Sequence, residues 1–337
     1  MKKHIPMGSI GVFKHVIRQV RVDHDFKGFD KDGNAIYLHD SPYKTIRIFG
    51  YEKLHGTQAS IVFHKDGTKT YQSKERVLSL ESDNARFMAL MSTKNTDFLI
   101  EGIDFKENIT IYSEWCGGSI QKTVALNQLP NLFVVFGIKV DGEWIEKSIE
   151  NRPELGIYDI RNFKKWEIDI DFNDPQQVQN KLVDWTLEVE DRSPFAIAIG
   201  IDETKGSIGE GIVFSTPDKK FWFKVKGEKH ANGSKVHKLA QIDLEIVNSA
   251  NEFVNLVLTA SRLEQGISFL KENNHELSKK STPIYLDWIK RDIIKEETDT
   301  LTKNGLDINT VVSNITTKAR EFYFNALNDI WLEKTIN

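Results

Sequence analysis

The apolar and polar residues follow two different periods along the chain. From residue 16 to about residue 240, short runs mostly alternate with a period of two, and Asp-Gly pairs separate some of them at residues 32–33, 66–67 and 141–142. An Asp-Gly pair between β-branched or aromatic residues is a strong signal of a β-hairpin. We therefore expect this part of the chain to consist mostly of strands in antiparallel sheets.

One strand is predicted over residues 57–64. Ala59, Ile61 and Phe63 alternate there with residues that are mostly polar, as in a strand with one buried face. Lys53 is then expected in the turn directly before this strand.

A second strand is predicted over residues 221–226, where the alternation places Lys224 and Lys226 on the same face. Both ammonium groups could therefore contact one phosphate. Residues 219–238 contain one acidic residue and seven lysines, namely Lys219, Lys220, Lys224, Lys226, Lys229, Lys235 and Lys238. The net charge of −4 excludes a protein coated in basic surface, but nucleic-acid binding needs only such a local patch. A solvated lysine-rich hairpin is the alternative interpretation.

Two helices are expected to interrupt the strands, over residues 80–92 and 175–187. Asp174 is placed to cap the second helix, and Pro175 suits the first helical position because its fixed φ is helical and its missing N–H is not needed there. Neither helix carries a candidate functional residue.

After about residue 240 the period changes to between three and four, which is typical of amphipathic helices. The first apolar stripe comprises Ile246, Val247, Ala250, Phe253, Val254, Val257 and Leu258. Thr282 and Pro283 begin another helix, and a last helix begins at about Asn309. The sequence thus predicts a sheet-containing domain over residues 1–240 and a small all-helical domain over residues 241–337.

Length and composition narrow the class of protein. The 337 residues are long for a single domain, which favours two. Cys116 is the single cysteine, so a disulfide within the chain and a multi-cysteine zinc site are excluded. No apolar run approaches the roughly 18 residues of a membrane span, and Pro6, Gly8 and Gly11 interrupt the stretch that follows the basic start. We therefore expect a soluble, cytoplasmic protein without membrane contact.

Six short motifs follow one another along the chain. They are Lys53-Leu54-His55-Gly56, Ser73-Lys74-Glu75-Arg76, Ile111-Tyr112-Ser113-Glu114, the run Phe133-Val134-Val135-Phe136-Gly137-Ile138, Glu210-Gly211-Ile212-Val213, and Lys224-Val225-Lys226. Their order and spacing resemble those of the covalent nucleotidyltransferases. DNA ligases and capping enzymes usually carry Asp where His55 stands, and the His form resembles the RNA ligase 2 family of nick-sealing RNA ligases.

This resemblance implies an α+β fold, with an antiparallel-sheet nucleotidyltransferase domain of the ATP-grasp-like ligase type followed by a helical domain that helps to hold nucleic acid. It also implies ATP as the nucleotide and Lys53 as the nucleophile that accepts AMP. A lysine must lose its proton to attack, and burial and nearby cations lower its pKa. Lys224 and Lys226 are expected to supply this positive field and to neutralise charge on the α-phosphate.

The resemblance assigns roles to further residues. His55 would assist nucleotide transfer, and Gly56 would let the backbone approach the nucleotide. Arg76 would contact the ribose or the phosphate to be joined, although a surface ion pair is its structural alternative. Glu114 would lie near the ribose, with a solvent-facing strand residue as the alternative.

The last two assigned residues concern adenine and the metal. Phe136 matches the aromatic residue that stacks on adenine, although its apolar neighbours by themselves favour a core position. Glu210 would lie near Mg²⁺ or Mn²⁺, because carboxylates are suitable ligands for such ions.

Two positions depart from the family pattern. Gly137 stands where the family usually has Asp directly after the stacking aromatic residue. This change removes a carboxylate and puts catalytic efficiency and metal dependence in question. Gln58 stands where Asn is usual, and it keeps the amide chemistry.

The sequence therefore predicts an enzyme of RNA repair, an ATP-dependent RNA ligase that seals 3′-OH and 5′-phosphate RNA ends through lysyl-AMP and RNA-adenylate intermediates. RNA, as a nicked duplex, is its expected partner, and no obligate protein partner is implied. One alternative is a DNA ligase or a capping-type nucleotidyltransferase, which the labelling nucleotide and the sealed strand would distinguish. The other is a catalytically silent RNA-binding relative, which would bind RNA without forming the covalent adduct.

Overall fold

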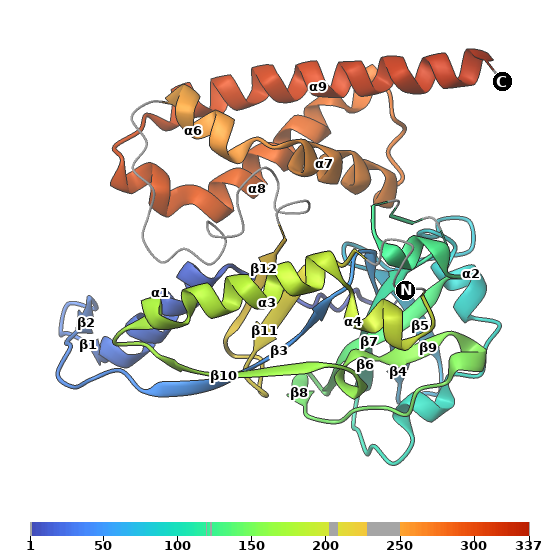
Figure 1. The fold of residues 1–337 in the computed structure, drawn as a ribbon, viewed down its shortest axis with the longest axis horizontal. Coiled ribbons are helices and arrows are strands. Elements are labelled where there is room, and N and C mark those ends of the chain that lie inside the picture. Colours follow the sequence, from blue (N-terminus) through green and yellow to red (C-terminus); the bar gives the residue numbers. More distant parts are fainter. Residues whose placement is uncertain (1, 119, 122, 202–207, 228–249, 337) are drawn as a thin grey trace. The chain divides into compact units, whose positions relative to one another are not determined.

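The computed structural model describes residues 2–118, 120–121, 123–201, 208–227 and 250–336. Within these ranges, residues up to 227 form one compact unit, and residues from 250 onward belong to a second (Figure 1). No helix in the described ranges combines the length and the apolar character that a membrane-spanning segment needs.

The first unit contains two larger sheets and a separate hairpin. The four-stranded sheet has the order β10 (Lys165–Asp171), β3 (Thr45–Lys53), β11 (Gly211–Ser215) and β12 (Trp222–Lys226). The six-stranded sheet has the order β5 (Lys69–Ser73), β4 (Thr57–His64), β6 (Asn108–Cys116), β7 (Leu132–Val140) and β8 (Glu143–Ile145), with β9 (Ile157–Asp159) also paired to β7. The hairpin consists of β1 (Phe26–Phe29) and β2 (Ala35–Tyr37).

The prediction of antiparallel strands is confirmed for every described strand pair except the parallel pair β7 and β9. Each of the three Asp-Gly pairs lies in the connection of a different hairpin. The hairpins are β1–β2, β4–β5 and β7–β8. Asp141 and Gly142 both have positive φ angles, of 50° and 92°, as a two-residue hairpin turn requires.

Helices cover one face of the four-stranded sheet (Figure 1). Ile212, Phe214 and Phe223 pack on this face against α1 (Phe13–Asp25) and α3 (Gln179–Asp191). The prediction of mostly strands from residue 16 onward is wrong for α1. Its buried side chains lie on one helical face, and they are Phe13, Val16, Ile17 and Val20.

The strand predicted over residues 57–64 is confirmed as β4, but both of its faces are buried. Ile61 and Phe63 lie in the core of the six-stranded sheet, and Ser60 and Val62 on the opposite face are buried as well. The buried side chain of Gln72 donates a hydrogen bond to Ser60 Oγ. Tertiary packing therefore covers a face that its polar residues had suggested was exposed.

The N-terminal segment contacts edge strands of both larger sheets. The backbone N–H of Ile5 donates to Gln72 Oε1 and Gln72 Nε2 donates to the Ile5 carbonyl, each over 3.0 Å. At the other end of the segment, the N–H of Lys224 donates to the Gly11 carbonyl over 3.0 Å. Residues 5–11 therefore link β5 of one sheet to β12 of the other.

The prediction of a helix over residues 80–92 is wrong for the first half of that range, because α2 spans only Phe87–Met91. The guanidinium of Arg76 donates to the carbonyl oxygens of Ser82 and Asp83, which fixes the preceding loop. Ala85 and Arg86 have positive φ angles of 47° and 59°, and such angles interrupt a right-handed helix.

The helix predicted over residues 175–187 exists in two parts, a 3₁₀ turn over Pro175–Val178 followed by α3. Pro175 occupies the first turn as expected, but Asp174 caps no backbone N–H and accepts instead from the Gln177 side chain. The other short elements are α4 (Pro194–Ala198) and the 3₁₀ turns Asp97–Ile100, Ala125–Gln128, Pro153–Leu155 and Ile160–Asn162.

Helices make up the described part of the second unit, residues 250–336. They are α6 (Ala250–Val257), α7 (Ala260–Glu272), a 3₁₀ turn (Lys279–Ser281), α8 (Thr282–Lys303) and α9 (Ile308–Ile336). Phe253, Tyr285 and Ile315 are fully buried in its core, and α8 and α9 begin at or within one residue of the predicted positions. Ile246, Val247 and the predicted boundary at residue 240 lie outside the described residues, so that boundary stays a prediction.

Glu52 connects β3 to α4 through a buried carboxylate. Ser193 Oγ donates to Glu52 Oε1, and the backbone N–H of Phe195 donates to Oε2 over 2.8 Å. Burial raises the pKa of Glu52 to about 7, although these hydrogen bonds oppose the shift. The folded state therefore favours the protonated acid, and this contribution to stability is complete below about pH 4.5 and is lost as the pH rises through 7.

We expect Glu52→Gln to remove this pH dependence, because an amide cannot ionise. Relative to wild type, the variant should gain on the order of 1–3 kcal/mol in free energy of unfolding between about pH 4.5 and pH 8. Urea titrations at several pH values measure the difference, and Glu143→Gln, at an exposed strand position, is the control. Parallel pH profiles of Glu52→Gln and wild type would contradict the prediction.

Candidate active site

Lys53, Glu210 and Lys226 meet at one end of the four-stranded sheet. Strand β11 lies between β3 and β12, and its first residue, Gly211, is in register with Lys53 on one side and with Lys226 on the other. Glu210 directly precedes Gly211, so the two lysines lie on either side of this carboxylate. The sheet register thus brings together residues that are 157 positions apart in the sequence.

Glu210 is the centre of a set of ion contacts. Its Oε2 lies 2.7 Å from Lys53 Nζ and 3.0 Å from His55 Nδ1, and its Oε1 lies 2.7 Å from Lys226 Nζ. The Glu210 side chain is 1% exposed. A buried carboxylate requires such partners, because an unpaired charge in the interior is strongly unfavourable.

The electrostatics of Lys53 differ from the prediction. Burial favours a lower pKa for its ammonium, but the charges of Glu210 and Glu114 outweigh burial and raise the pKa of Lys53 above its usual range. Burial is the largest effect at Lys226, whose pKa is lowered, and the charges of Lys53 and Lys224 add to this. The expectation that the pKa of Lys53 is lowered is therefore wrong for the protein without nucleotide.

Glu210 itself remains a carboxylate. Burial favours a higher pKa for this group, but Lys226, Lys53 and His55 hold its pKa well below the usual range. The Lys226 ammonium contacts Glu210 Oε1, and Lys53 and His55 contact Oε2. An ionised, buried oxygen of this kind is a suitable ligand for Mg²⁺ or Mn²⁺.

Gly56 and Glu114 lie beside this cluster. The backbone N–H of Gly56 donates to Glu114 Oε1 over 2.9 Å, and burial raises the pKa of Glu114 to about 7, against the opposing charge of Lys53. A Cβ atom at Gly56 would lie 2.3 Å from the Trp115 carbonyl oxygen. Glycine is therefore needed here so that the loop after β3 can approach strand β6.

The other residues of the first motif differ slightly from their predicted positions. Lys53 is the last residue of β3 rather than part of a turn, so the sheet fixes its backbone directly. His55 lies in the short connection to β4 and still reaches Glu210.

Phe136 and Lys224 lie on strands of different sheets. Phe136, on β7, is partly buried and packs against the cluster that contains Leu54. Its ring centroid is 6.3 Å from that of Trp222 on β12, so this aromatic contact joins the two sheets. Lys224 alternates with Lys226 along β12, as predicted.

Arg76 is held in the loop before α2. Its described contacts are hydrogen bonds to the Ser82 carbonyl, the Ser82 hydroxyl and the Asp83 carbonyl. Asn84, in the same loop, donates to Thr57 Oγ1 over 3.1 Å, directly after Gly56. Arg76 thus supports the loop that adjoins the first motif, and contact with a nucleotide or an RNA end stays a prediction.

The structure gives a physical reason for the departure at Gly137. A Cβ atom there would lie 2.7 Å from the Trp144 ring and 3.2 Å from Lys219 Cε. The Lys219 ammonium lies 5.5 Å from the Trp144 ring centroid and 4.7 Å from that of Trp222, and burial lowers the pKa of Lys219 to about 8. The side chains of Trp144 and Lys219 thus fill the space that an aspartate side chain at residue 137 would enter.

Sequence reasoning did not identify this aromatic and lysine cluster. Lys219 and Trp222 lie within the basic patch that had been noted, so the interleaving of aromatic and basic residues was an available signal. Trp144 is far from them in the sequence, and only the β7–β8 hairpin brings it to Gly137. Lys229, Lys235 and Lys238 of the patch lie outside the described residues.

Lys53, Glu210 and Lys226 thus come from three of the six motifs and meet at one end of an antiparallel sheet. The sequence model of the RNA ligase family matches residues 47–226, which is more than half of the chain. The protein therefore belongs to the RNA ligase family. No curated protein matches the sequence significantly.

Solved structures of an RNA ligase from Naegleria gruberi are similar to this chain. Two variants with ATP and Mn are each 15% identical, with TM-scores of 0.43 and 0.44, and the matches cover 71% and 70% of this chain and 58% and 60% of theirs. A variant with AMP and Mn is 14% identical, with a TM-score of 0.43, over 70% of this chain and 60% of that one. The chain thus spans less than two thirds of the length of these proteins.

We expect Glu210→Gln to lower the pKa of Lys53, because the carboxylate that holds the ammonium in its charged form is lost. Lys53 should then react faster with an amine acylating reagent at pH 8, as measured by mass spectrometry of the Lys53 peptide. Glu52→Gln is the matched control, since Glu52 adjoins Lys53 in sequence but contacts α4. Equal Lys53 reactivity in wild type and Glu210→Gln would count against the ion pair.

We expect Gly137→Asp to lower the free energy of unfolding by roughly 1–3 kcal/mol, because the new side chain overpacks the space beside Trp144. Chemical denaturation measures this loss. Trp144→Ala removes the obstructing ring, so the double variant should be more stable than the sum of the two single losses predicts. Additive losses would show that residue 137 and Trp144 do not compete for the same space.

Proposed function

We propose that this protein is an ATP-dependent RNA ligase that joins 3′-OH and 5′-phosphate RNA ends. The observation that carries the proposal is the contact of Lys53 and Lys226 with the buried Glu210, because each of these residues stands in a motif of the family. In the first step, Lys53 Nζ attacks the α-phosphorus of ATP. The new P–N bond replaces the P–O bond to pyrophosphate, and Lys53 loses a proton.

Two further steps complete the sealing reaction. An oxygen of the RNA 5′-phosphate attacks the phosphorus of lysyl-AMP, which breaks the P–N bond and frees Lys53. The 3′-hydroxyl oxygen then attacks the 5′-phosphorus of the RNA-adenylate, loses its proton, and displaces AMP as the phosphodiester forms.

The ion pair with Glu210 must be broken before Lys53 can attack. Glu210 raises the pKa of Lys53. Any group that replaces Lys53 as the partner of this carboxylate therefore favours the neutral, nucleophilic amine. Glu210 is the residue that would hold Mg²⁺ or Mn²⁺. When bound, such an ion supplies positive charge that stabilises developing negative charge on phosphate oxygens.

Other residues would bind and orient ATP. Lys224 and Lys226 would neutralise charge on the α-phosphate, and His55 would assist transfer of the nucleotide. Phe136 is half-buried rather than fully enclosed, which supports a role in stacking on adenine.

The remaining roles concern the ribose and the RNA. Glu114, which accepts from the N–H of Gly56, would lie near the ribose, and Arg76 would contact the ribose or the phosphate to be joined. The helical unit from residue 241 onward would contribute to RNA binding. A nicked RNA duplex is the substrate that the His form of the first motif favours.

We expect wild-type protein to become labelled when it is incubated with α-labelled ATP and Mg²⁺, and Lys53→Ala to remain at background, because the acceptor nitrogen is absent. Denaturing electrophoresis measures the label, after bound AMP has been removed. Lys220→Ala should label as wild type does, because Lys220 is exposed and pairs with Asp23. Equal labelling of Lys53→Ala would contradict the assignment of the nucleophile.

The labelled protein also separates the alternatives. Transfer of label to a nicked RNA duplex and loss of the nick support the RNA ligase. Labelling by GTP would indicate a capping-type enzyme, and preferential sealing of nicked DNA would indicate a DNA ligase. RNA binding without any covalent label would indicate a silent relative.

A further inference from the structure

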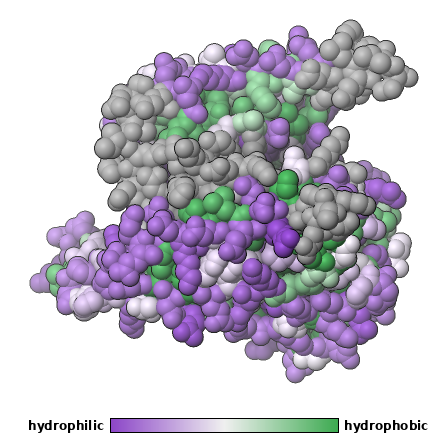
Figure 2. All heavy atoms as spheres, viewed as in Figure 1, coloured by the Kyte–Doolittle hydropathy of each residue, from purple (hydrophilic) through white to green (hydrophobic). Residues whose placement is uncertain are grey.

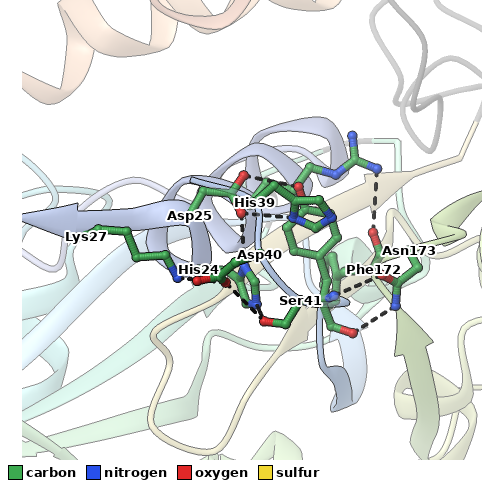
Figure 3. A network of polar contacts seen from close by, with 10 residues as sticks. His24, Asp25, Lys27, His39, Asp40, Ser41, Phe172 and Asn173 are labelled. Carbon is green, nitrogen blue, oxygen red and sulfur yellow. Dashed lines mark hydrogen bonds and ion pairs between the residues drawn. The ribbon is translucent and has the colours of Figure 1, made fainter. Parts of the chain in front are cut away.

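Three potential metal ligands meet at the base of the β1–β2 hairpin, a part of the molecule that the proposed ligase reaction does not use. His24 and Asp25 are the last residues of α1, and His39 follows β2 (Figure 3). Nδ1 of His24 and Nδ1 of His39 lie 2.9 Å and 3.1 Å from the same oxygen, Asp25 Oδ1. Among the described residues, this is the one group of three His, Cys, Asp or Glu side chains whose ligand atoms all lie within 4.8 Å of one another.

The spacing of these atoms is close to that of a zinc site. Zinc binds nitrogen and oxygen ligands at about 2.0–2.2 Å in a tetrahedron, so neighbouring ligand atoms lie about 3.3 Å apart. The observed contacts are shorter by a few tenths of an ångström. The two contacts with Asp25 therefore lie near the ligand spacing of a zinc site, and the ligand atoms of all three side chains lie within 4.8 Å of one another.

We propose that His24, Asp25 and His39 bind a divalent transition metal of the zinc type, with water as a further ligand. Two imidazoles and one carboxylate suit zinc and its neighbours in the periodic table, whereas Mg²⁺ and Ca²⁺ prefer sites made of oxygen atoms. The His39 side chain is 50% exposed and those of His24 and Asp25 are 19% exposed. The ligands are thus held by the fold and still open to ions from solvent.

A set of outer contacts orients the three ligands. Ser41 Oγ lies 3.2 Å from His24 Nε2, the ring nitrogen that does not face Asp25. The hydroxyl of Tyr43 donates to Asp25 Oδ2 over 3.2 Å, so the second carboxylate oxygen is also occupied. Metal-binding histidines and carboxylates are typically held by outer partners of this kind.

Tyr43 is itself held in place by Asn173. The N–H of Tyr43 donates to Asn173 Oδ1 over 2.9 Å, and Asn173 Nδ2 donates to the Tyr43 carbonyl over 2.8 Å. The Tyr43 ring centroid also lies 4.5 Å from that of His39. The outer partner of the carboxylate is therefore anchored to the segment that follows β10.

The hairpin gives a reason for a metal at this position. A two-stranded hairpin alone is marginally stable in water, and Phe29 and Tyr37 on this hairpin are 69% and 56% exposed. A metal bound by Asp25 and His39 would join the chain directly before β1 to the chain directly after β2. It would thus fix the two ends of the hairpin to each other and lower the entropy of the hairpin in the unfolded state.

Metal binding and simple hydrogen bonding require different forms of the histidines. Without metal, the Asp25 carboxylate can only accept, so each histidine carries a proton on the Nδ1 that contacts it. With metal, each Nδ1 provides a lone pair, so the proton lies on Nε2 and His24 donates to Ser41 Oγ. The two states are therefore distinguishable by the ring nitrogen signals in NMR spectra.

The test is a zinc titration of the full-length protein after removal of metals with a chelator. We expect wild type to bind one zinc ion more than His39→Gln does, because glutamine can still donate to Asp25 but is a poor zinc ligand. Loss of an outer partner alone typically weakens metal binding by roughly 10–100-fold, so loss of the ligand His39 should weaken this site at least tenfold. Thermal unfolding with and without zinc measures the accompanying rise in Tm. Only proteins with the intact hairpin site should show the part of this rise that the site contributes.

Control variants separate this site from others that bind zinc. His275→Ala changes a histidine of the second unit and should retain the extra zinc ion, whereas His24→Ala should lose it. Zinc binding at Glu210 would be the same in all these variants, so the difference between them reports the hairpin site alone. Equal zinc stoichiometry in wild type, His24→Ala and His39→Gln, or Nδ1 protonation that zinc does not change, would overturn the proposal.

Discussion

The ionised, buried carboxylate of Glu210 is the group on which the candidate active site depends. It holds Lys53 from β3 and Lys226 from β12 at 2.7 Å each, and it can do so because β11 lies between those strands. An unpaired carboxylate in this position would be strongly unfavourable, and so would two unpaired lysines. The charges are therefore mutually required, and they fix the geometry of the site before any nucleotide binds.

This arrangement also keeps the lysine in its unreactive form. Glu210 and Glu114 raise the pKa of Lys53, so the free protein holds the protonated ammonium rather than a ready nucleophile. The same residue thus positions Lys53 and restrains it.

The two larger sheets of the first unit are joined at several places beside the site. The ring of Phe136 contacts Trp222 across the sheets, and residues 5–11 bond to Gln72 on one side and to the backbone of Lys224 on the other. Hydrophilic residues dominate the visible surface of this unit (Figure 2). A segment that carries none of the six motifs therefore contacts both sheets beside the candidate site.

The sequence alone determined the local features of this protein. Asp-Gly pairs predicted the three hairpins because their turn requires positive φ angles, alternation predicted β4 and the shared face of Lys224 and Lys226, and the motif order indicated the family. Tertiary structure decided the rest. The pKa of Lys53 depends on charges about 60 to 160 positions away. Trp144 fills the space beside Gly137, and Gln72 of the neighbouring strand provides a hydrogen-bond partner for the buried Ser60 of β4. Each of these is a contact between distant segments, which the period of a single segment cannot specify.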